Sequence, residues 1–236
     1  IVAINSPTPF NLKGWDRDVV DACLWIGWGG AMGTESLGDV LVGNIEPSGH
    51  LTDTWAFDMY SAPAANNFGN YTYSSMPTNA PKDHNKYVVY QEGIYVGYRY
   101  YETRYEDVVL GRGNAANKVG GVMNKEKWSY TDEVAYTFGY GAGYNDYEYS
   151  DVKFAFDKQT DDYTVTVTVK NKGTIPGKDA VQVYLQKPYT QYDIDNGIEK
   201  AAVELVGFAK TEEIAPGATD TVTITVPEYE FKSYDA

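Results

Sequence analysis

The chain has 236 residues, 43% of them hydrophobic and 22% charged, which suits one large or two ordinary globular domains. Its formal net charge of -14, with no cluster of Lys or Arg to offset it, argues against nucleic acid and anionic membranes as partners. No apolar run is long enough to span a membrane, and no basic segment precedes an apolar one as in a signal peptide, so bacterial cytoplasm and secretion both remain open as locations.

The first fifty residues predict a β-loop-β-α arrangement, which is typical of the end of an α/β unit. "IVAIN" at 1–5 reads as a buried strand, which needs neighbours that a larger protein or a second chain would supply. "ACLWIGWGG" at 22–30 predicts a second strand that ends in glycines. "GTESLGDVLVGN" at 33–44 predicts a short helix, with Thr34 or Ser36 as its cap.

Cysteine and histidine usage bounds the chemistry. Cys23 is the only cysteine, so an internal disulfide is excluded, and its apolar surroundings predict a buried, inert thiol. His50 and His84, the only histidines, have no clustered Cys and no surrounding signature, which argues against a zinc site and a Ser-His-Asp triad. The sequence therefore implies neither a metal nor an organic cofactor.

Residues 58–86 predict a long surface loop. The segment "SAPAANNFGNYTYSSMPTNAPKDHNK" is rich in Asn, Ser, Pro and Ala and lacks apolar periodicity. Loops of this length often act as lids or binding arms. A loosely packed insertion fits the composition equally well.

The next stretch, "YQEGIYVGYRYYET" at 90–103, is rich in Tyr. Ile94, Gly97, Tyr98 and Tyr101 recur at helical spacing, so we predict a helix over 93–103. Its amphipathic Tyr rings suit a helix that packs between a sheet and a polar loop. Whether one or two of them line a sugar site is left open.

Polar, glycine-rich sequence follows. Residues 105–135 contain an evident loop, "GRGNAANKVGG", which lacks the Gly-Lys-Ser/Thr ending of a phosphate-binding loop. The glycines of "YTFGYGAGYNDYEYS" at 136–150 permit tight turns.

From about residue 151 the pattern changes to alternating strands joined by turn residues. In "DYTVTVTVKNKG", Val165, Val167 and Val169 face one way and the intervening Thr residues face the other. Repeated strands of this kind indicate an all-β sandwich. We therefore predict an α/β + all-β chain, with a partial α/β sandwich domain at 1–150 and a β-sandwich at 151–236.

Several segments, taken in chain order, resemble glycoside hydrolase family 3, the β-glucosidase group. They are "GDVLVGNIEPSGHLTDTW", "YQEGIYVGYRYYET", "YTFGYGAGYNDYEYS", "TVTVTVKNKGTIPGKDAVQVYLQKP" and "VELVGFAKTEEIAPGATDTVTITV". The resemblance implies that the first domain is the latter part of an α/β sandwich domain and that the second is fibronectin type III-like. Two departures, "YTFGYG" for a phenylalanine-proline step and "GGAMGTE" for a glycine-rich turn, make loop contacts harder to transfer.

The resemblance also implies a retaining glycosidase that acts on terminal β-linked glucosyl residues. Its Asp nucleophile would lie on a TIM-like barrel, and its acid/base Glu on a loop upstream of the strand that "IVAIN" resembles. Neither segment can be matched here, so the expected partner is the barrel segment, as a second chain or in the same polypeptide, and the expected substrate is a β-glucoside. In some relatives the barrel follows the fibronectin-like domain. A fragment cut from such a protein would start inside a strand, as "IVAIN" does, and would have an open end, as "YEFKSYDA" does.

Glu92 is the carboxylate that invites a catalytic role, because it lies between a long loop and an aromatic cluster where burial would raise its pKa. The architectural alternative is a buried Glu92 that pairs with Arg99 or caps a helix starting near Gly93. Because the family places its acid/base elsewhere, we expect the architectural role and an inactive isolated chain.

Trp28 and Glu35 are the candidate substrate contacts, because they flank the glycine-rich turn after the second strand. Ligands of α/β sheets bind beyond the carboxyl ends of strands, where an indole could stack on a pyranose and a carboxylate could accept from sugar hydroxyls. The alternatives are a core Trp and a Glu that favours a helix N-terminus.

Two alternatives to an enzyme function remain open: a carbohydrate-binding module and a purely structural subunit. "YDIDNG" at 192–197 is similar to part of a calcium loop but lacks its full spacing and its final Glu, so a polar turn is expected. Whether the complete protein forms a homodimer is left open by the sequence.

Overall fold

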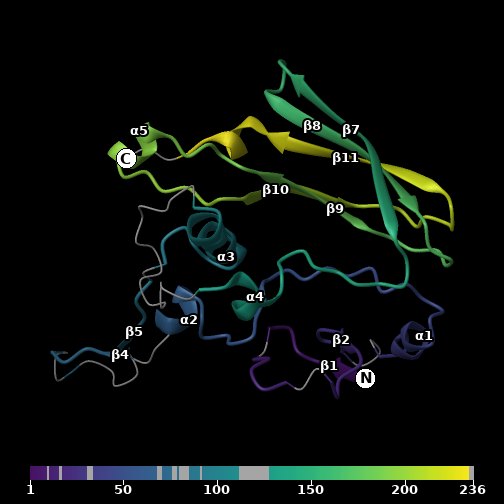
Figure 1. Ribbon diagram of the computed structural model, residues 1–236, viewed down its shortest axis with the longest axis horizontal. Coiled ribbons are helices and arrows are strands. Elements are labelled where there is room, and N and C mark those ends of the chain that lie inside the picture. The colour runs from purple at the N-terminus through teal and green to yellow at the C-terminus, as the bar shows by residue number, and fades with distance from the viewer. Residues whose placement is uncertain are drawn as a thin grey trace.

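The computed structural model describes residues 1–9, 11–15, 18–30, 34–67, 71–75, 79, 85–90, 92–111 and 128–233. Figure 1 shows a β-sandwich lying beside a part that mixes short helices and strands, here named the α/β part. None of the helices in these residues is long and apolar enough to cross a membrane.

The α/β part begins with the predicted β-loop-β-α arrangement. Strands β1 (Val2–Ile4) and β2 (Cys23–Trp25) pair in parallel, and helix α1 (Leu37–Leu41) follows. Ser36 occupies the N-cap position without a side-chain hydrogen bond to the helix, and Gly43 leaves it at a φ of 79°.

The expectation of a buried Cys23 is wrong. Its side chain is exposed, because the β1–β2 sheet has only two strands in the described residues and little packs against this position. Partial burial nevertheless raises the pKa of the thiol, which keeps it protonated at neutral pH.

The segment predicted as one long loop contains secondary structure. It holds helix α2 (Pro63–Asn67) and most of a hairpin formed by β4 (Tyr71–Thr72) and β5 (Lys86–Tyr87). His84 lies outside the described residues, as do most of the residues of "GRGNAANKVGG".

The helix predicted over 93–103 starts five residues later. Helix α3 spans Tyr98–Arg104 and continues as a π-helical turn, Tyr105–Val109. Gly93 and Gly97 have φ values of 58° and 59°, a left-handed conformation that ends any right-handed helix, so the apolar spacing across them does not mark one helical face.

The remaining α/β elements frame α3. Helix α4 (Tyr130–Glu133) leads directly into β6 (Val134–Tyr136), which pairs with β3 (Trp55–Ala56). Their cluster of buried residues includes Tyr95, Tyr100 and Tyr101. The prediction that the Tyr-rich stretch serves packing therefore holds for these three rings, whereas Tyr90 is exposed.

The second part is a sandwich of two antiparallel sheets. One sheet has the order β11-β8-β7 and the other pairs β10 with β9. The strands are β7 (Tyr147–Asp157), β8 (Asp162–Asn171), β9 (Ala180–Leu185), β10 (Glu204–Lys210) and β11 (Thr219–Pro227), with helix α5 (Gln191–Asp195) before β10 and a 3-10 turn (Glu228–Phe231) after β11.

The predicted alternation along β8 is confirmed. Val165, Val167 and Val169 are buried between the sheets, as the side-chain period of two residues requires. They pack with Val and Ile residues of the other strands and connections: Val181, Ile214, Val222, Ile224 and Val226.

The domain boundary between residues 150 and 151 stays a prediction. Strand β7 begins at Tyr147 and runs through it, with a break in register between Ser150 and Lys153 and a φ of 50° at Asp151.

Side chains of α3 join the two parts. The Tyr98 hydroxyl accepts a hydrogen bond from the Leu205 amide at 2.7 Å, and the Thr103 hydroxyl accepts one from the Ala202 amide at 2.9 Å. At another point His50 lies 3.3 Å from Asp179. The sandwich is thus fixed to the α/β part by polar contacts at separate places.

Candidate functional site

The carboxyl ends of β1 and β2 form a common edge. The Ile26 amide, directly after β2, donates to the Ile4 carbonyl at 3.0 Å, so both strands end side by side. The Trp25 indole donates to the Ser6 carbonyl and packs edge-on against Trp55, with 5.5 Å between ring centroids. The loop after each strand is therefore held at an edge where ligands of α/β sheets bind.

Trp28 and Glu35 lie on the loop that leaves this edge. Trp28 is 79% exposed, so it is not the core residue of the alternative reading, and Glu35 is exposed as well. Within the described residues, neither side chain has a hydrogen bond or an ion pair. An uncommitted indole and carboxylate can therefore meet a ligand or another protein segment.

Glu92 belongs to a different place, the turn that precedes α3. Figure 1 shows α3 against the sandwich, whereas β1 and β2 lie on the far side of the α/β part. Glu92 is buried, and its carbonyl accepts from the Tyr95 amide at 3.0 Å. The structure thus separates Glu92 from the loop that carries Trp28 and Glu35.

Of the two architectural roles predicted for Glu92, the capping role is wrong, because α3 begins at Tyr98 and not near Gly93. The pairing of Glu92 with Arg99 stays a prediction. Arg99 has an ion pair with Glu204 of the sandwich, with 3.8 Å between its Nε and a carboxylate oxygen. Gly97, and not Glu92, occupies the N-cap position of α3.

A buried polar cluster at the end of α3 is absent from the sequence predictions. The Arg104 guanidinium lies 3.5 Å from a Glu133 carboxylate oxygen and donates to the Tyr100 hydroxyl at 2.6 Å. It also lies 4.7 Å from the centroid of the Trp128 ring, whose N–H donates to Glu133. We name these four residues the Arg104 cluster.

Burial governs the acidity of this region. It raises the pKa of Glu133, and the neighbouring Arg104 charge opposes that rise. Burial also raises the pKa of Tyr101 to about 12, with the Ser61 hydroxyl 3.0 Å away. The Glu133 carboxyl group is enclosed by the Trp128 ring and the Arg104 guanidinium. A substrate would have to displace them to reach it.

The Arg104 cluster gave little signal in the sequence because Arg104 and Glu133 are far apart along the chain and follow no motif. A single Arg and a single Glu at the ends of short apolar stretches also fit solvent-exposed positions. Helix α4, which leads into the β6 strand paired with β3, meets α3 through tertiary packing.

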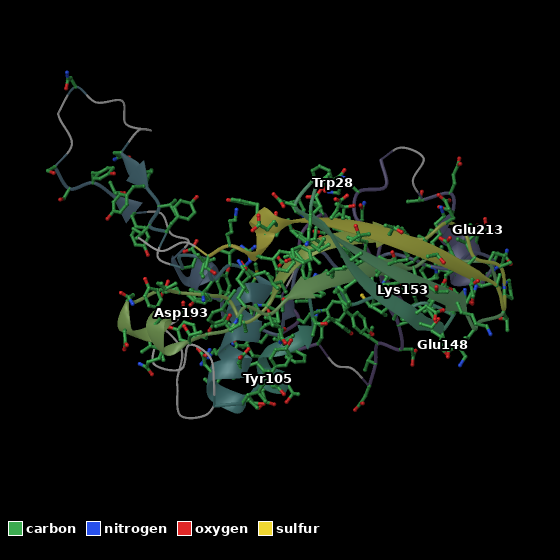
Figure 2. All side chains as sticks on the ribbon, turned by 90° about the horizontal axis from the view of Figure 1, so that it is seen from above. Trp28, Tyr105, Glu148, Lys153, Asp193 and Glu213 are labelled. Atoms are coloured by element: carbon green, nitrogen blue, oxygen red, sulfur yellow. The ribbon has the colours of Figure 1, made fainter. Side chains whose placement is uncertain are left out.

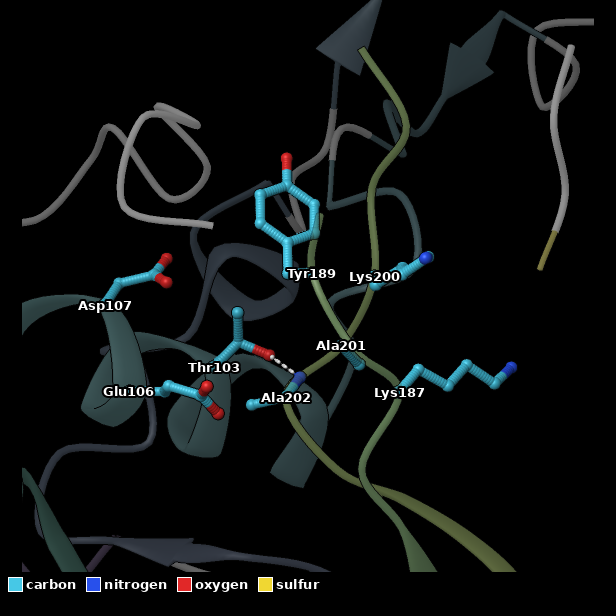
Figure 3. A pocket seen from close by; sticks show the side chains of 8 residues that line it. All are labelled: Thr103, Glu106, Asp107, Lys187, Tyr189, Lys200, Ala201 and Ala202. Carbon is cyan, nitrogen blue, oxygen red and sulfur yellow. Dashed lines mark hydrogen bonds between the residues drawn. The ribbon is translucent and has the colours of Figure 1, made fainter. Parts of the chain in front are cut away.

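A small polar pocket opens where α3 meets the sandwich (Figure 3). It is lined by Thr103, Glu106 and Asp107 on one side and by Lys187, Tyr189 and Lys200 on the other. Its volume of about 10 Å³ holds a single water molecule at most, far less than a sugar requires. We therefore regard it as part of the joint between the two parts.

The stretch "YDIDNG" forms part of helix α5 and is already occupied by protein groups. Thr190 and Asp193 form a capping box, and the Lys200 ammonium lies 2.7 Å from Asp193. This contact lowers the pKa of Asp193 to about 2. Asp193 lies at the α5 end of the molecule, well apart from Trp28 (Figure 2).

Comparison with protein families assigns both parts. Residues 1–98 match the glycosyl hydrolase family 3 C-terminal domain. Residues 179–236 match the fibronectin type III-like domain. The two matches occur in the order that the sequence resemblance implied.

Relatives match along the whole chain. A "Beta-glucosidase" from Ruminococcus albus is 34% identical over 237 residues, which cover 100% of this chain and 20% of the relative. The "Thermostable beta-glucosidase B" from Acetivibrio thermocellus is 30% identical over 239 residues, 100% of this chain and 25% of the relative.

Solved structures of β-glucosidases are similar to this chain as well. Beta-glucosidase 3B from Thermotoga neapolitana, solved in complex with alpha-D-glucose, is 32% identical, with a TM-score of 0.73 over 99% of this chain and 26% of its own. This chain therefore spans about a fifth to a quarter of the proteins it resembles.

Proposed function

Because this chain belongs to glycosyl hydrolase family 3, we propose that it is a portion of a retaining β-glucosidase-like enzyme. The complete polypeptide releases terminal, non-reducing β-linked glucosyl residues. The observation that carries this proposal is the match of the whole chain to proteins named as β-glucosidases, one of them solved with glucose bound.

The reacting carboxyl groups lie outside this chain in our proposal. A retaining glycosidase needs two of them about 5–5.5 Å apart. The Asp nucleophile of the barrel segment attacks the anomeric carbon while the acid/base Glu protonates the leaving oxygen, and water then hydrolyses the glycosyl-enzyme. The residues described here form the surroundings of that reaction.

Trp28 and Glu35 are the contacts that this chain contributes. They lie on an exposed loop at the carboxyl edge of β1 and β2. The indole stacks on the apolar face of a glucosyl ring, and the carboxylate accepts hydrogen bonds from its hydroxyls. Both contacts orient a neutral substrate, which the overall negative charge neither attracts nor repels.

An assay of this chain and of the complete polypeptide with an aryl β-glucoside tests the proposal. The chain alone gives no turnover, and the complete polypeptide hydrolyses the substrate with β-glucose as the first product by NMR. Turnover by the chain alone that Glu92→Gln abolishes would place the chemistry here and overturn the proposal. α-Glucose as first product would refute retention.

The alternative function is a non-catalytic carbohydrate-binding module, which the exposed Trp28 favours. Calorimetric titration of the chain alone with glucose and cellobiose separates the two. If the isolated chain binds sugar and Trp28→Ala removes that binding, the result supports the module. Binding only to the barrel segment, with no sugar affinity, supports a structural subunit.

A further inference from the structure

One buried carboxylate lies where three segments of the chain meet. Glu46 is 8% exposed and follows helix α1 by five residues. Its two carboxylate oxygens accept hydrogen bonds from consecutive backbone amides of the segment that leads into β7: Tyr144 at 2.9 Å and Asn145 at 3.3 Å. The third segment is the turn before β9, where a Cβ added at Gly177 would lie 2.8 Å from the Glu46 Cγ atom. Glu46 therefore joins the α1 segment to the sandwich through charge-assisted hydrogen bonds.

Glycines keep these segments close to Glu46. A Cβ added at Gly143 would lie 1.9 Å from a Glu46 carboxylate oxygen, and one added at Gly173 would lie 1.8 Å from the side-chain oxygen of Asn145. Neither place has room for a side chain. The backbone thus approaches these two polar groups more closely than any residue other than glycine would allow.

The contact at Glu46 continues into α1. The Tyr144 hydroxyl donates to the Val40 carbonyl of α1 at 2.7 Å. The Asn44 amide, two residues before Glu46, donates to the Asp39 carbonyl of the same helix at 2.8 Å. Glu46 is therefore connected to α1 along the chain and, through Tyr144, across it.

Helix α1 in turn places Glu35. The Leu37 amide donates to the Thr34 carbonyl at 3.2 Å, so Glu35 lies in the turn that leads into the helix. None of the five residues of α1 is buried, and a helix of this length is marginal by itself. The position of α1, and with it that of Glu35, therefore depends on polar contacts such as those at Val40 and Glu46.

The other end of the contact is anchored in the sandwich core. The Asn145 side chain donates to the Ile175 carbonyl at 2.9 Å. The backbones of Gly177 and Ile214 exchange two hydrogen bonds, and Ile214 is 2% exposed in the core between the sheets. Glu46 thus connects a packed core to a helix that buries none of its own side chains.

We propose that Glu46 is a positioning residue for the substrate site. Its carboxylate carries the fixed position of the sandwich to α1 and so holds Glu35 where it accepts hydrogen bonds from sugar hydroxyls. The inference rests on the proposed function, because Glu46 acts through Glu35 and itself touches no substrate. Displacement of a contact by about 1 Å is enough to weaken substrate binding.

The competing role for Glu46 is purely architectural, as an attachment point for the sandwich. The contacts between His50 and Asp179 and between Tyr98 and Leu205 attach the sandwich at other places. Attachment therefore does not depend on Glu46 alone. The two roles differ in what a substitution changes: the melting temperature only, or the KM of the folded enzyme.

Steady-state kinetics of the complete polypeptide with an aryl β-glucoside, at a temperature where every variant is folded, separate the two roles. Glu46→Ala raises the KM about fivefold to tenfold and lowers the kcat by less than about threefold, because a substrate contact is displaced while the reacting carboxyl groups stay in place. Glu46→Gln keeps one acceptor oxygen, so its KM lies between those of the parent and of Glu46→Ala.

The control for these variants is Glu228→Ala, which removes an exposed ion pair with Lys232 and leaves the KM unchanged. An unchanged KM in Glu46→Ala, together with a lower melting temperature, would assign the architectural role and overturn the proposal.

A double-variant cycle tests whether Glu46 acts through Glu35. In the Glu35→Ala background, Glu46→Ala raises the KM by less than about twofold, because the contact that it positions is already lost. Equal fold-changes in both backgrounds would overturn the route through Glu35.

Tyr144→Phe keeps the proposal testable if Glu46→Ala does not fold. It removes only the hydroxyl that donates to Val40, and Tyr144 is 54% exposed. In hydrogen exchange with mass spectrometry of the complete polypeptide, the amides of residues 40–45 exchange at least about threefold faster than in the parent. Tyr229→Phe, at a position that is 75% exposed, is the control and leaves this exchange unchanged. Unchanged exchange in Tyr144→Phe would refute the connection to α1.

Hydrogen exchange does not depend on activity, so this inference and the proposed function fail separately. Faster exchange of residues 40–45 in a polypeptide without glucosidase activity upholds the hold of Glu46 on α1 and refutes the proposed function. An active polypeptide in which neither the exchange nor the KM responds refutes the positioning role alone.

Discussion

The core of the sandwich and the core around α3 are filled by different side chains. Between the two sheets lie Val and Ile residues, which carry no polar groups. Around α3 the buried rings Tyr100 and Tyr101 lie beside Arg104 and Glu133, which are also buried. The first core depends on non-directional apolar burial, and the second depends on each polar group keeping its partner.

The difference teaches which changes each region tolerates. Shortening an apolar side chain removes contacts in proportion to the atoms lost. Removing one member of a buried ion pair costs more than the pair contributes, because the other charge is left without compensation. The following substitutions test this contrast in the chain itself.

The largest effect is expected from Arg104→Leu. It leaves the Glu133 carboxylate buried without its cation and removes the bond to Tyr100, so the free energy of unfolding falls by about 3–5 kcal/mol. Urea unfolding followed by circular dichroism measures the change.

The double variant Arg104→Leu with Glu133→Leu is the control for that prediction. It removes both charges, and we expect it to recover part of the loss. A double variant less stable than Arg104→Leu would show that the pair itself, and not the unpaired charge, carries the stability.

A smaller effect is expected from Val169→Ala in the sandwich. Val169 is fully buried, and the loss of its two methyl groups lowers the free energy of unfolding by about 2 kcal/mol. Thr168→Ala, on the opposite face of β8, changes it by less than about 1 kcal/mol. Similar losses for the two variants would contradict a core confined to one face.

A pH-dependent effect should separate the regions further. The contact with Lys200 lowers the pKa of Asp193 from 3.8 to about 2, so its stabilisation is present above the ordinary value and is lost as the pH falls toward about 2. Lys200→Met therefore lowers the melting temperature near about pH 6, and the difference from the parent chain shrinks near about pH 2.

The Arg104 cluster should respond in the opposite sense. Burial raises the pKa of Glu133, so the contribution of this shift to stability is present below the ordinary value of 4.5 and is lost as the pH rises through the raised value.

The control for the Lys200→Met prediction is Lys178→Met, which removes an exposed ion pair with Glu212. A pH-independent difference for Lys200→Met would contradict the assignment of Asp193.

The smallest change in stability is expected from Trp28→Ala. Because the side chain is exposed, the free energy of unfolding changes by less than about 0.5 kcal/mol. In the complete polypeptide, Trp28→Ala raises the KM for an aryl β-glucoside about threefold to tenfold. Trp28→Phe keeps an aromatic ring, so its KM stays close to that of the parent polypeptide. An unchanged KM would remove Trp28 from the substrate contacts.

The sequence predicted the sandwich core better than the core around α3. Alternation along β8 has a period of two, so the inward Val residues could be read directly. The start of α3 was misplaced because the spacing counted Gly97 as helical, and its left-handed backbone appears only in the structure. Cys23 was expected inside because an apolar run does not reveal how many strands cover it.

The candidate site was predictable only in part. Trp28 and Glu35 could be proposed because a strand that ends in glycines marks the edge of a sheet, and their role stays a prediction. The Arg104 cluster was missed because its members come from separate elements with no common spacing. Contacts of this kind depend on tertiary packing, which a local pattern does not encode.

Phe154 on β7 is 74% exposed although it lies opposite the buried Val165, and this exposure has a consequence for production of this chain in the laboratory. In dilute buffer the negative charge keeps the molecules apart, but salt near physiological strength screens charges beyond about 8 Å. The edges of β7 and β9 that pair with no other described strand then act as templates for edge-to-edge assembly, so turbidity should grow as sodium chloride is added. Storage at low ionic strength should keep the recombinant material clear.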